Sequence, residues 1–251
     1  MNASLSTTLH GTLSQHASTR AYRDAAIPTP VLDRIIEAGW RGPTSINGQQ
    51  VSLVVVQDST RRAEIAKIAG GQPWIAQAPV FITVVMDFSK TALGVEVAGK
   101  QQVIHDSIEG TMVGAVDAGI TLGRLMAAAQ AEGLGVVPIG GIRRDPQAMI
   151  KLLNLPPLTF PLVGLALGYP ATAAPRKPRL PLSTFRHDER YQAEGIAEAI
   201  TDYDRELLDY WQSIGRTDGL PWSQNIAQYY QSVYFPEVAP AMRAQGFSFE
   251  R

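Results

Sequence analysis

Four short runs of hydrophobic residues, rich in aliphatic side chains, divide the first two thirds of the chain. They span residues 51–56, 79–86, 136–139 and 160–167. Glycine, proline or polar residues flank these runs, a pattern that is typical of buried strands. The chain is therefore expected to build its core around a sheet.

Helical spacing of hydrophobic residues separates these runs. It predicts helices over residues 31–38 and 60–69, and a third that Asp145 caps and that has Pro146 at its favoured first position. Residues 90–103 mix glycine with polar residues and are expected to form an irregular connection. The predicted core therefore combines strands with helices.

The longest helix is expected from Asp106 to about Glu132. Asp106 and Glu109 match a capping box, in which each side chain accepts a hydrogen bond from a free backbone N–H. Glycines at 110, 114, 119 and 123 lower its helix propensity. We therefore expect another backbone to pack closely against this helix, near a subunit contact. Its charged residues, including Asp117 and Arg124, are not expected in a membrane span.

The composition changes after residue 168. Prolines at 170, 175, 178 and 181 indicate an extended arm, and an amphipathic helical tail follows from about residue 196, broken at 215–219. We expect a single domain over 1–251, with its core in 1–170. Residues 171–251 would form an arm and C-terminal helices that embrace a partner subunit, and 210–222 could serve as a lid.

The bulk composition excludes several classes of protein. Of 251 residues, 45% are hydrophobic and 18% are charged, and the net charge of −1 gives no support for a nucleic-acid or membrane partner. The absence of cysteine excludes disulfides, thiolate metal sites and cysteine nucleophiles. The four histidines lack metal-ligand spacing, so no metal is expected. The first residues do not resemble a signal peptide, and a cytoplasmic location is expected.

Two near-matches to nucleotide-binding motifs are not interpreted as sites. Residues 94–101 resemble the phosphate loop of NTPases, but Gln101 stands where a magnesium-binding hydroxyl is needed. Gly133 and Gly135 precede a strand rather than follow one, which is the wrong order for a dinucleotide fingerprint. Neither motif therefore assigns a cofactor.

Two other stretches concentrate side chains that suit a phosphorylated aromatic cofactor. They are His16-Ala17-Ser18-Thr19-Arg20 and the turn over residues 42–50, which contains Thr44, Ser45, Ile46 and Gln50. An arginine side chain can bind two phosphate oxygens at once. Each stretch is also compatible with a plain solvated loop. Because the sequence offers no comparable set of acid, base and nucleophile, we expect no catalytic side chain and place the chemistry in a cofactor.

In their order along the chain, these segments resemble the nitroreductase family of FMN flavoproteins, in its NADPH-dependent nitroreductase and flavin reductase branch. The resemblance covers nearly the whole chain. It is carried by residues 16–20, 41–50, 70–72, 133–141, 162–170, 177–181, Trp222-Ser223 and 245–247.

The resemblance implies an α+β sandwich with a central mixed sheet flanked by helices. It also implies a homodimer with FMN at the interface, contacted by both subunits. Residues 16–20, with Lys177 and Arg179, would hold the phosphate and ribityl chain, while Gln72 would lie at the polar edge of the ring. The full set of implied FMN-binding residues is His16, Ala17, Ser18, Thr19, Arg20, Thr44, Ser45, Ile46, Gln50, Gln72, Pro138, Ile139, Gly140, Gly141, Lys177, Pro178 and Arg179.

The implied activity is FMN-dependent transfer of hydride from NAD(P)H to nitroaromatics, quinones or free flavin, by a ping-pong scheme. Arg20 and Arg216 would contact NAD(P)H. Ala17 and the single arginine near residue 216 depart from the more basic pattern of this branch, so NADPH and NADH both stay open. The alternatives are a flavoprotein of the same fold with a dehalogenase-like or flavin-fragmenting task, and a non-catalytic flavin-binding regulator.

Overall fold

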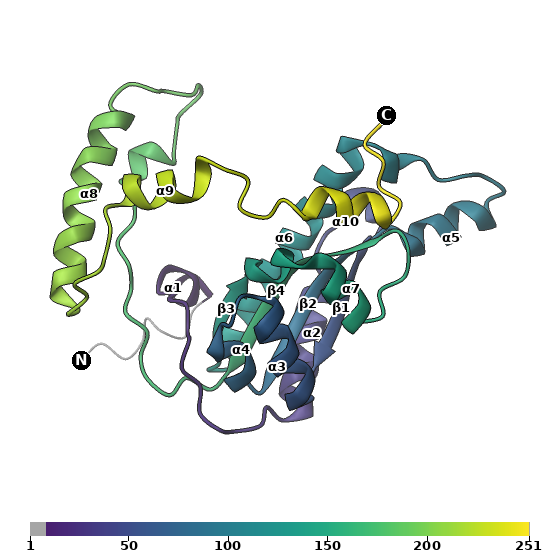
Figure 1. Ribbon diagram of the computed structural model, residues 1–251, viewed down its shortest axis with the longest axis horizontal. Helices are drawn as coiled ribbons and strands as arrows, with labels where there is room; N and C mark the ends of the chain where they lie inside the picture. Colours follow the sequence, from purple (N-terminus) through teal and green to yellow (C-terminus); the bar gives the residue numbers. More distant parts are fainter. Residues whose placement is uncertain (1–8, 251) are drawn as a thin grey trace. The chain divides into compact units, whose positions relative to one another are not determined.

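The computed structural model describes residues 9–250, and the chain forms two compact units (Figure 1). The first unit comprises the residues up to Ala174 together with those from Phe235 onwards. The second unit comprises Pro175–Tyr234. Each unit is described below by itself.

A sheet of four strands forms the centre of the first unit. The strands are β1 (Val51–Val56), β2 (Val80–Asp87), β3 (Gly135–Ile139) and β4 (Thr159–Gly168), in the spatial order β1-β2-β4-β3. The α+β class is confirmed, but the three strand pairs are all antiparallel, so the expectation of a mixed sheet is wrong for residues 9–250. Hydrophobic runs indicate burial and carry no signal for the direction of neighbouring strands.

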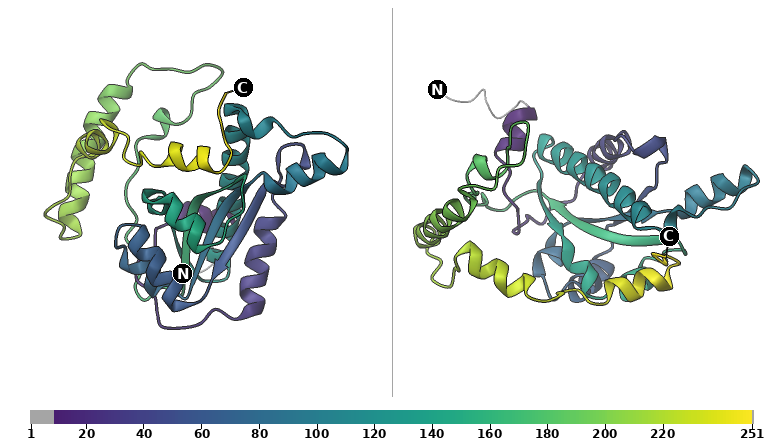
Figure 2. Two further views of the ribbon diagram at one scale, coloured as in Figure 1. Left: turned by 45° about the vertical axis from the view of Figure 1, so that its right-hand side comes forward. Right: turned by 90° about the horizontal axis from the view of Figure 1, so that it is seen from above.

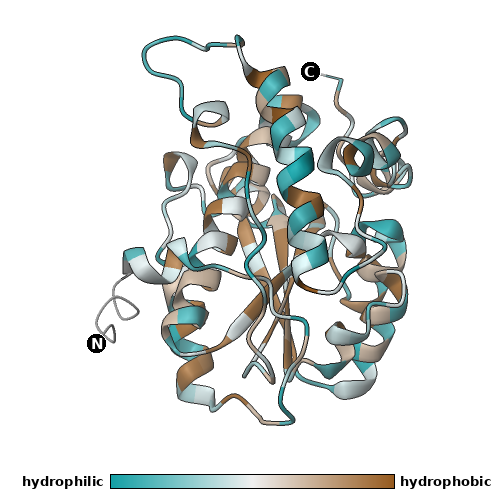
Figure 3. Ribbon diagram, turned by 90° about the vertical axis from the view of Figure 1, so that its left-hand side faces the viewer, coloured by the Kyte–Doolittle hydropathy of each residue, from teal (hydrophilic) through white to brown (hydrophobic). Residues whose placement is uncertain are grey.

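Helices cover both faces of this sheet (Figure 2, right). The helices that cover the sheet are α2 (Thr29–Trp40), α3 (Ser59–Ile68), α4 (Pro73–Gln77), α6 (Ile108–Ala131) and α7 (Pro146–Leu152). Alternate side chains of a strand point to opposite faces. Val80 and Ile82 therefore pack in the cluster that includes α2 and α6, while Phe81 packs in the cluster with α3, α4 and α7. The strands are coloured mostly as hydrophobic in Figure 3.

Three differences from the predicted helices concern their ends and short elements. Helix α6 is capped by Ser107, whose Oγ accepts a hydrogen bond from Gly110 N at 3.0 Å, so the predicted capping box at Asp106 is wrong. Asp106 instead lies in the 3₁₀ turn η2 (Ile104–Asp106). Helix α5 (Ser89–Val97) replaces the expected irregular connection. A short helix, α1 (Leu9–Ser14), precedes the predicted cofactor segment.

The glycines of α6 fall into two groups. A methyl group added at Gly110 would lie 2.1 Å from Ile104 O, and one at Gly114 would lie 2.5 Å from Met86 Sδ. The expected close approach of another backbone is therefore confirmed at Gly110, whereas Gly114 packs against a side chain. Methyl groups at Gly119 and Gly123 would meet nothing within 4 Å, so these two glycines lie on an open face.

Helix α6 is also the one helix among residues 9–250 that is long and apolar enough to pass a length-and-composition test for a membrane span. The core helix of a soluble protein passes the same test. Ala118 and Leu125 of α6 are buried in the cluster that covers the sheet, which is the packing of a core helix.

The C-terminal residues from Phe235 onwards pack against the first unit near the end of β2 and the start of β4. Helix α10 (Val238–Ala244) contributes Met242 to a cluster with Phe88 and Phe160, and Phe247 is fully buried there. Gln245 Nε2 donates to the carbonyl oxygens of Pro156 and Thr159 at 2.8 and 2.9 Å. The C-terminal residues are therefore fixed to the core.

The second unit has a small core of its own. Its elements are η4 (Leu182–Thr184), α8 (Ile196–Ser213) and α9 (Trp222–Tyr230). Tyr203, Leu207 and Trp211 form the buried face of α8. The predicted helix from residue 196 and its break after residue 213 are confirmed.

Candidate functional site

The predicted cofactor segment at residues 16–20 lies along the start of β3. Thr19 N donates to Val136 O at 3.0 Å, and the Thr19 side chain is buried. A methyl group at Gly135 would lie 2.3 Å from Thr19 Oγ1, so only glycine permits this approach. A contact across about 115 residues of sequence therefore fixes the backbone of the segment.

Tyr22 holds the end of the same segment. Its hydroxyl donates to Thr19 O at 2.9 Å and lies 3.1 Å from Ala166 O. Burial raises the pKa of the Tyr22 phenol well above its ordinary value, and the charge of Arg20 opposes part of this shift. The phenol therefore stays protonated and keeps donating across the ordinary pH range.

Arg20, Gln72 and the glycines after β3 meet around the start of α4. The Arg20 guanidinium lies 5.5 Å from the centre of the Trp74 ring. Gln72 precedes α4 and donates from Nε2 to Ala69 O at 2.8 Å. A methyl group at Gly141, in the 3₁₀ turn η3 (Gly140–Arg144), would lie 2.5 Å from Gln72 Nε2. Contacts of Arg20 with Trp74 and of Gly141 with Gln72 thus connect three segments of the chain, residues 16–20, 72–74 and 138–141, which we call the α4–β3 cluster.

His16 supplies an open polar atom in this cluster. Its Nδ1 is buried and has no hydrogen-bond partner among residues 9–250. A buried polar atom without a partner is costly unless a ligand or water satisfies it. The cluster therefore combines an unsatisfied imidazole nitrogen with an arginine, a pair that suits a ligand with a phosphate group.

The 44–50 loop is anchored elsewhere. It includes the 3₁₀ turn η1 (Ser45–Asn47). Its hydrogen bonds with the core go to α6, where Asp117 accepts from Ser45 N at 3.1 Å, and to the end of β2, where Asp87 N donates to Gln50 O at 3.0 Å. No hydrogen bond or ring contact joins this loop to the α4–β3 cluster within the described chain. The predicted flavin residues of the first unit therefore form two separate groups.

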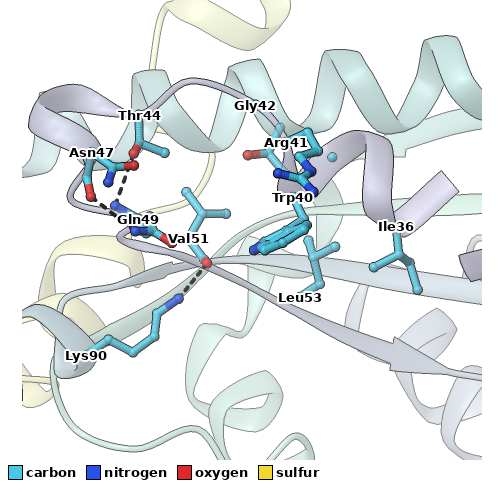
Figure 4. Close-up of a pocket in the computed structure, with 12 residues that line it drawn as sticks. Ile36, Trp40, Arg41, Gly42, Thr44, Asn47, Gln49, Val51, Leu53 and Lys90 are labelled. Atoms are coloured by element: carbon cyan, nitrogen blue, oxygen red, sulfur yellow. Dashed lines mark hydrogen bonds between the residues drawn. The ribbon is translucent and has the colours of Figure 1, made fainter. Parts of the chain in front are cut away.

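A pocket of about 480 Å³ lies between the 44–50 loop, the end of α2 and the outer edge of β1. Side chains of the loop line one side and Trp40 lines the other (Figure 4). Lys90 Nζ donates to Val51 O at 2.8 Å and so covers one carbonyl group of the edge strand. Thr44 lines this pocket, whereas no residue of the α4–β3 cluster does.

Two of the cations predicted to bind cofactor or nucleotide, Lys177 and Arg216, lie over one tryptophan ring in the second unit. Lys177 Nζ and the Arg216 guanidinium lie 4.7 and 4.5 Å from the centre of the Trp211 ring. Tyr203 donates from its hydroxyl to Pro178 O at 2.7 Å, which fixes the arm to α8. Arg216 Nε also donates to Asp218 at 2.9 Å. Lys177 of the arm and Arg216, which lies between α8 and α9, therefore share one indole ring.

Sequence reasoning missed three residues of these groups: Asp117, Trp74 and Trp211. The signal for Asp117 was present, because it is a single acid between apolar residues of the longest helix. The two tryptophans carry no local signal, since their role depends on contacts with distant residues.

Comparison with known proteins identifies the family to which this chain belongs. The family model described as the nitroreductase family matches residues 13–169, more than half of the chain. This chain belongs to the nitroreductase family. The C-terminal domain of the nitroreductase family also matches, over residues 177–250. The family expected from the sequence is thereby confirmed.

Relatives within the family match over nearly their whole length. The FMN reductase [NAD(P)H] of Bacillus subtilis is 43% identical over 95% of this chain and 97% of its own. The structure of B. megaterium NfrA2 has a TM-score of 0.94 at 39% identity, covering 97% of this chain and 99% of that one. The NADPH:FMN oxidoreductase of Vibrio harveyi, solved with NAD⁺, has a TM-score of 0.87 at 31% identity over 97% and 99% of the two chains.

Proposed function

We propose that this nitroreductase-family chain is an FMN-dependent NAD(P)H oxidoreductase that reduces nitroaromatics, quinones or free flavin by ping-pong hydride transfer. Its similarity to an FMN reductase and to an NADPH:FMN oxidoreductase supports the cofactor and the reaction type. The structural observation that carries the proposal is the α4–β3 cluster. There His16 Nδ1 and Arg20, which belong to one segment, are linked through Trp74 and Gln72 to the distant glycine turn at Gly141.

The residues of the α4–β3 cluster match the parts of FMN. Arg20 would bind the phosphate, and the buried His16 nitrogen would gain a hydrogen-bond partner. Gly141 is packed against Gln72, and the Gln72 amide would lie at the polar edge of the ring. When bound, FMN supplies hydride transfer between the nicotinamide and the acceptor, while the protein binds, orients and excludes water.

The arm would contribute to binding of NAD(P)H. Arg216 is the cation proposed for the nucleotide, and its Nε already pairs with Asp218. A carboxylate beside this guanidinium would repel an additional phosphate group. We therefore expect both NADH and NADPH to serve as donors, with less preference for NADPH than a more basic arm would give.

We further propose that the enzyme is a homodimer in the cytoplasm. The separation of the 44–50 loop from the α4–β3 cluster supports a site that a second copy completes. An unpartnered face of α6 supports the same arrangement, because Ile108, Met112 and Val116 are 62%, 58% and 61% exposed beside the open Gly119 and Gly123. Exposed apolar side chains in a row are typical of an interface. A cysteine-free chain suits a reducing compartment.

The decisive experiment uses the purified full-length protein. Apo-protein is titrated with FMN, and the holo-protein is then reduced without oxygen by NADPH or by NADH, and re-oxidised by a nitroaromatic compound. We expect a yellow protein that either nucleotide bleaches and the acceptor restores. A colourless protein that cannot be reconstituted with FMN would overturn the proposal.

The cluster itself is tested by Arg20→Ala, with Arg61→Ala on α3 as the matched control. Arg61 is exposed, and its guanidinium lies outside the α4–β3 cluster. Removing one arginine–phosphate contact is expected to weaken FMN binding at least tenfold, while the control keeps the affinity of the native chain. Equal affinities in the two variants would contradict the assignment of Arg20. A protein that binds FMN and is not reduced by NAD(P)H would instead favour the regulator.

A further inference from the structure

We propose that the buried carboxylate of Asp117 is a positioning residue that holds the 44–50 loop in the conformation used to contact FMN. The inference rests on the proposed function, because the loop acts only if the chain binds flavin. Asp117 lies in the middle of α6 and is 3% exposed. It is not among the residues that would touch the cofactor.

The loop adopts a backbone conformation that its sequence does not favour. Ile46, Asn47 and Gln49 have φ angles of 49°, 58° and 54°, in the left-handed region. For residues other than glycine this region is disfavoured, since Cβ approaches a backbone oxygen. Three such residues within seven require outside support, and backbone strain of this kind is concentrated at functional sites.

Asp117 supplies that support from the core. Its carboxylate accepts hydrogen bonds from Ser45 N at 3.1 Å and from Gln50 Nε2 at 2.5 Å, so it holds both ends of the turn. Gln50 is itself 3% exposed, and a methyl group at Gly48 would lie 2.3 Å from its Oε1. The loop backbone therefore folds over the Gln50 side chain, and the hydrogen bond to Asp117 holds this side chain in place.

The carboxylate has no compensating cation. No lysine, arginine or histidine within residues 9–250 forms an ion pair with Asp117. Burying a carboxylate without a cation is costly, and an apolar side chain at such a position is often as stable or more so. An acid retained here is therefore explained better by the conformation of the loop than by stability of the core.

The held conformation presents the outer side of the loop to solvent. Ile46 is 97% exposed, an unusual position for a large apolar side chain in an ordered turn. A loop that is already ordered binds a ligand more tightly than a flexible one, because no conformational entropy is lost on binding. Asp117 would thus raise FMN affinity through the order of Ser45 and Ile46, without contact of its own.

The test compares Asp117→Leu with Asp117→Asn. Leucine has a similar size and accepts no hydrogen bond, so FMN affinity should fall by about 10- to 100-fold. Asparagine can accept from Ser45 N and, with the Gln50 amide turned, donate to Gln50 Oε1. Its affinity should stay within about threefold of the native chain. Asp58→Leu is the matched control, because Asp58 accepts one backbone N–H, from Arg61 at 2.8 Å, at the start of α3.

A second readout uses the apo-protein and needs no flavin. Hydrogen exchange at the Ser45 amide should accelerate in Asp117→Leu and stay slow in Asp117→Asn, while the midpoint of thermal unfolding changes little. Asp117→Ala provides the same comparison if the leucine variant does not fold. Native-like FMN affinity in the leucine or alanine variant would overturn the proposal, and so would an unchanged exchange rate at Ser45. If the native chain bound no FMN, the proposed function would fail, and the exchange rates would still decide whether Asp117 orders the loop.

Discussion

Substitution of Gly123 by alanine separates two explanations for the open glycines of α6. In a single chain, the added methyl group meets nothing within 4 Å. Alanine is a better helix former than glycine by about 1 kcal/mol. If the face stays in water, Gly123→Ala should therefore raise the free energy of unfolding by about 1 kcal/mol, which corresponds to about 2–4 °C in Tm for a chain of this size.

If the proposed dimer forms through this face of α6, Gly123→Ala should instead weaken association of the two copies. The exposed side chains of Ile108, Met112 and Val116 continue the same face of α6 as Gly119 and Gly123. If a second copy packs its backbone against the glycines, the methyl group overpacks the interface. Overpacking costs about 1–3 kcal/mol, so the dissociation constant of the dimer should rise about tenfold or more.

Sedimentation equilibrium measures the dissociation constant, and thermal unfolding at several protein concentrations measures the stability of each variant. Gly94→Ala is the control for helix propensity, because Gly94 lies in α5 and a methyl group there also meets nothing within 4 Å. The reasoning would be refuted by a Gly123→Ala variant that gains stability and dimerises as tightly as the native chain. That result would remove this face of α6 from the interface.

Two further substitutions test the core around the proposed site. Gly141→Ala should weaken FMN binding and lower the free energy of unfolding by about 1–3 kcal/mol, measured by FMN titration and urea unfolding, because the methyl group would lie 2.8 Å from Ala69 O; unchanged binding and stability would contradict the tight packing. At Asp87, burial raises the carboxyl pKa, but hydrogen bonds from Ser52 and Ser89 and the charge of Lys90 bring it below its ordinary value. A lowered carboxyl pKa stabilises the fold at pH values above the ordinary pKa near 4, and this stabilisation is lost as the pH falls through the lowered pKa. The native chain should therefore lose its stability advantage over Asp87→Asn as urea unfolding is repeated from about pH 5 toward pH 3. A difference in stability that stays constant over this range would refute the assignment.

The elements that the sequence predicted well have purely local signals. The run at residues 51–56 matches β1 at both ends, and Asp145 caps α7 by accepting from Ala148 N at 2.9 Å. The cap of α6 was misplaced by one residue, because Asp106 and Ser107 are both good capping residues. Only the geometry of the first turn, where Gly110 N points to Ser107 Oγ, distinguishes them.

The candidate site depended less on local patterns. The resemblance to the nitroreductase family predicted that Arg20, Gln72 and Gly141 share a site, and contacts of Arg20 with Trp74 and of Gly141 with Gln72 link these segments in the structure. What no local pattern contains is the packing that fixes them, such as Thr19 against Gly135. For Asp117 the sequence does show an acid between apolar residues, but its role depends on the distant loop that folds over it.

The two separate groups of proposed flavin residues are consistent with a single explanation. Within one chain, the 44–50 loop holds a strained backbone and a fully exposed Ile46, and gains no contact with the α4–β3 cluster in return. The cluster in turn holds a buried His16 nitrogen without a partner. Backbone strain and an unsatisfied polar atom both reduce the stability of the fold, and a monomer without ligand has no interaction that offsets either of them. In the proposed dimer, the loop of one copy would face the cluster of the other across FMN, so cofactor binding and association would stabilise each other.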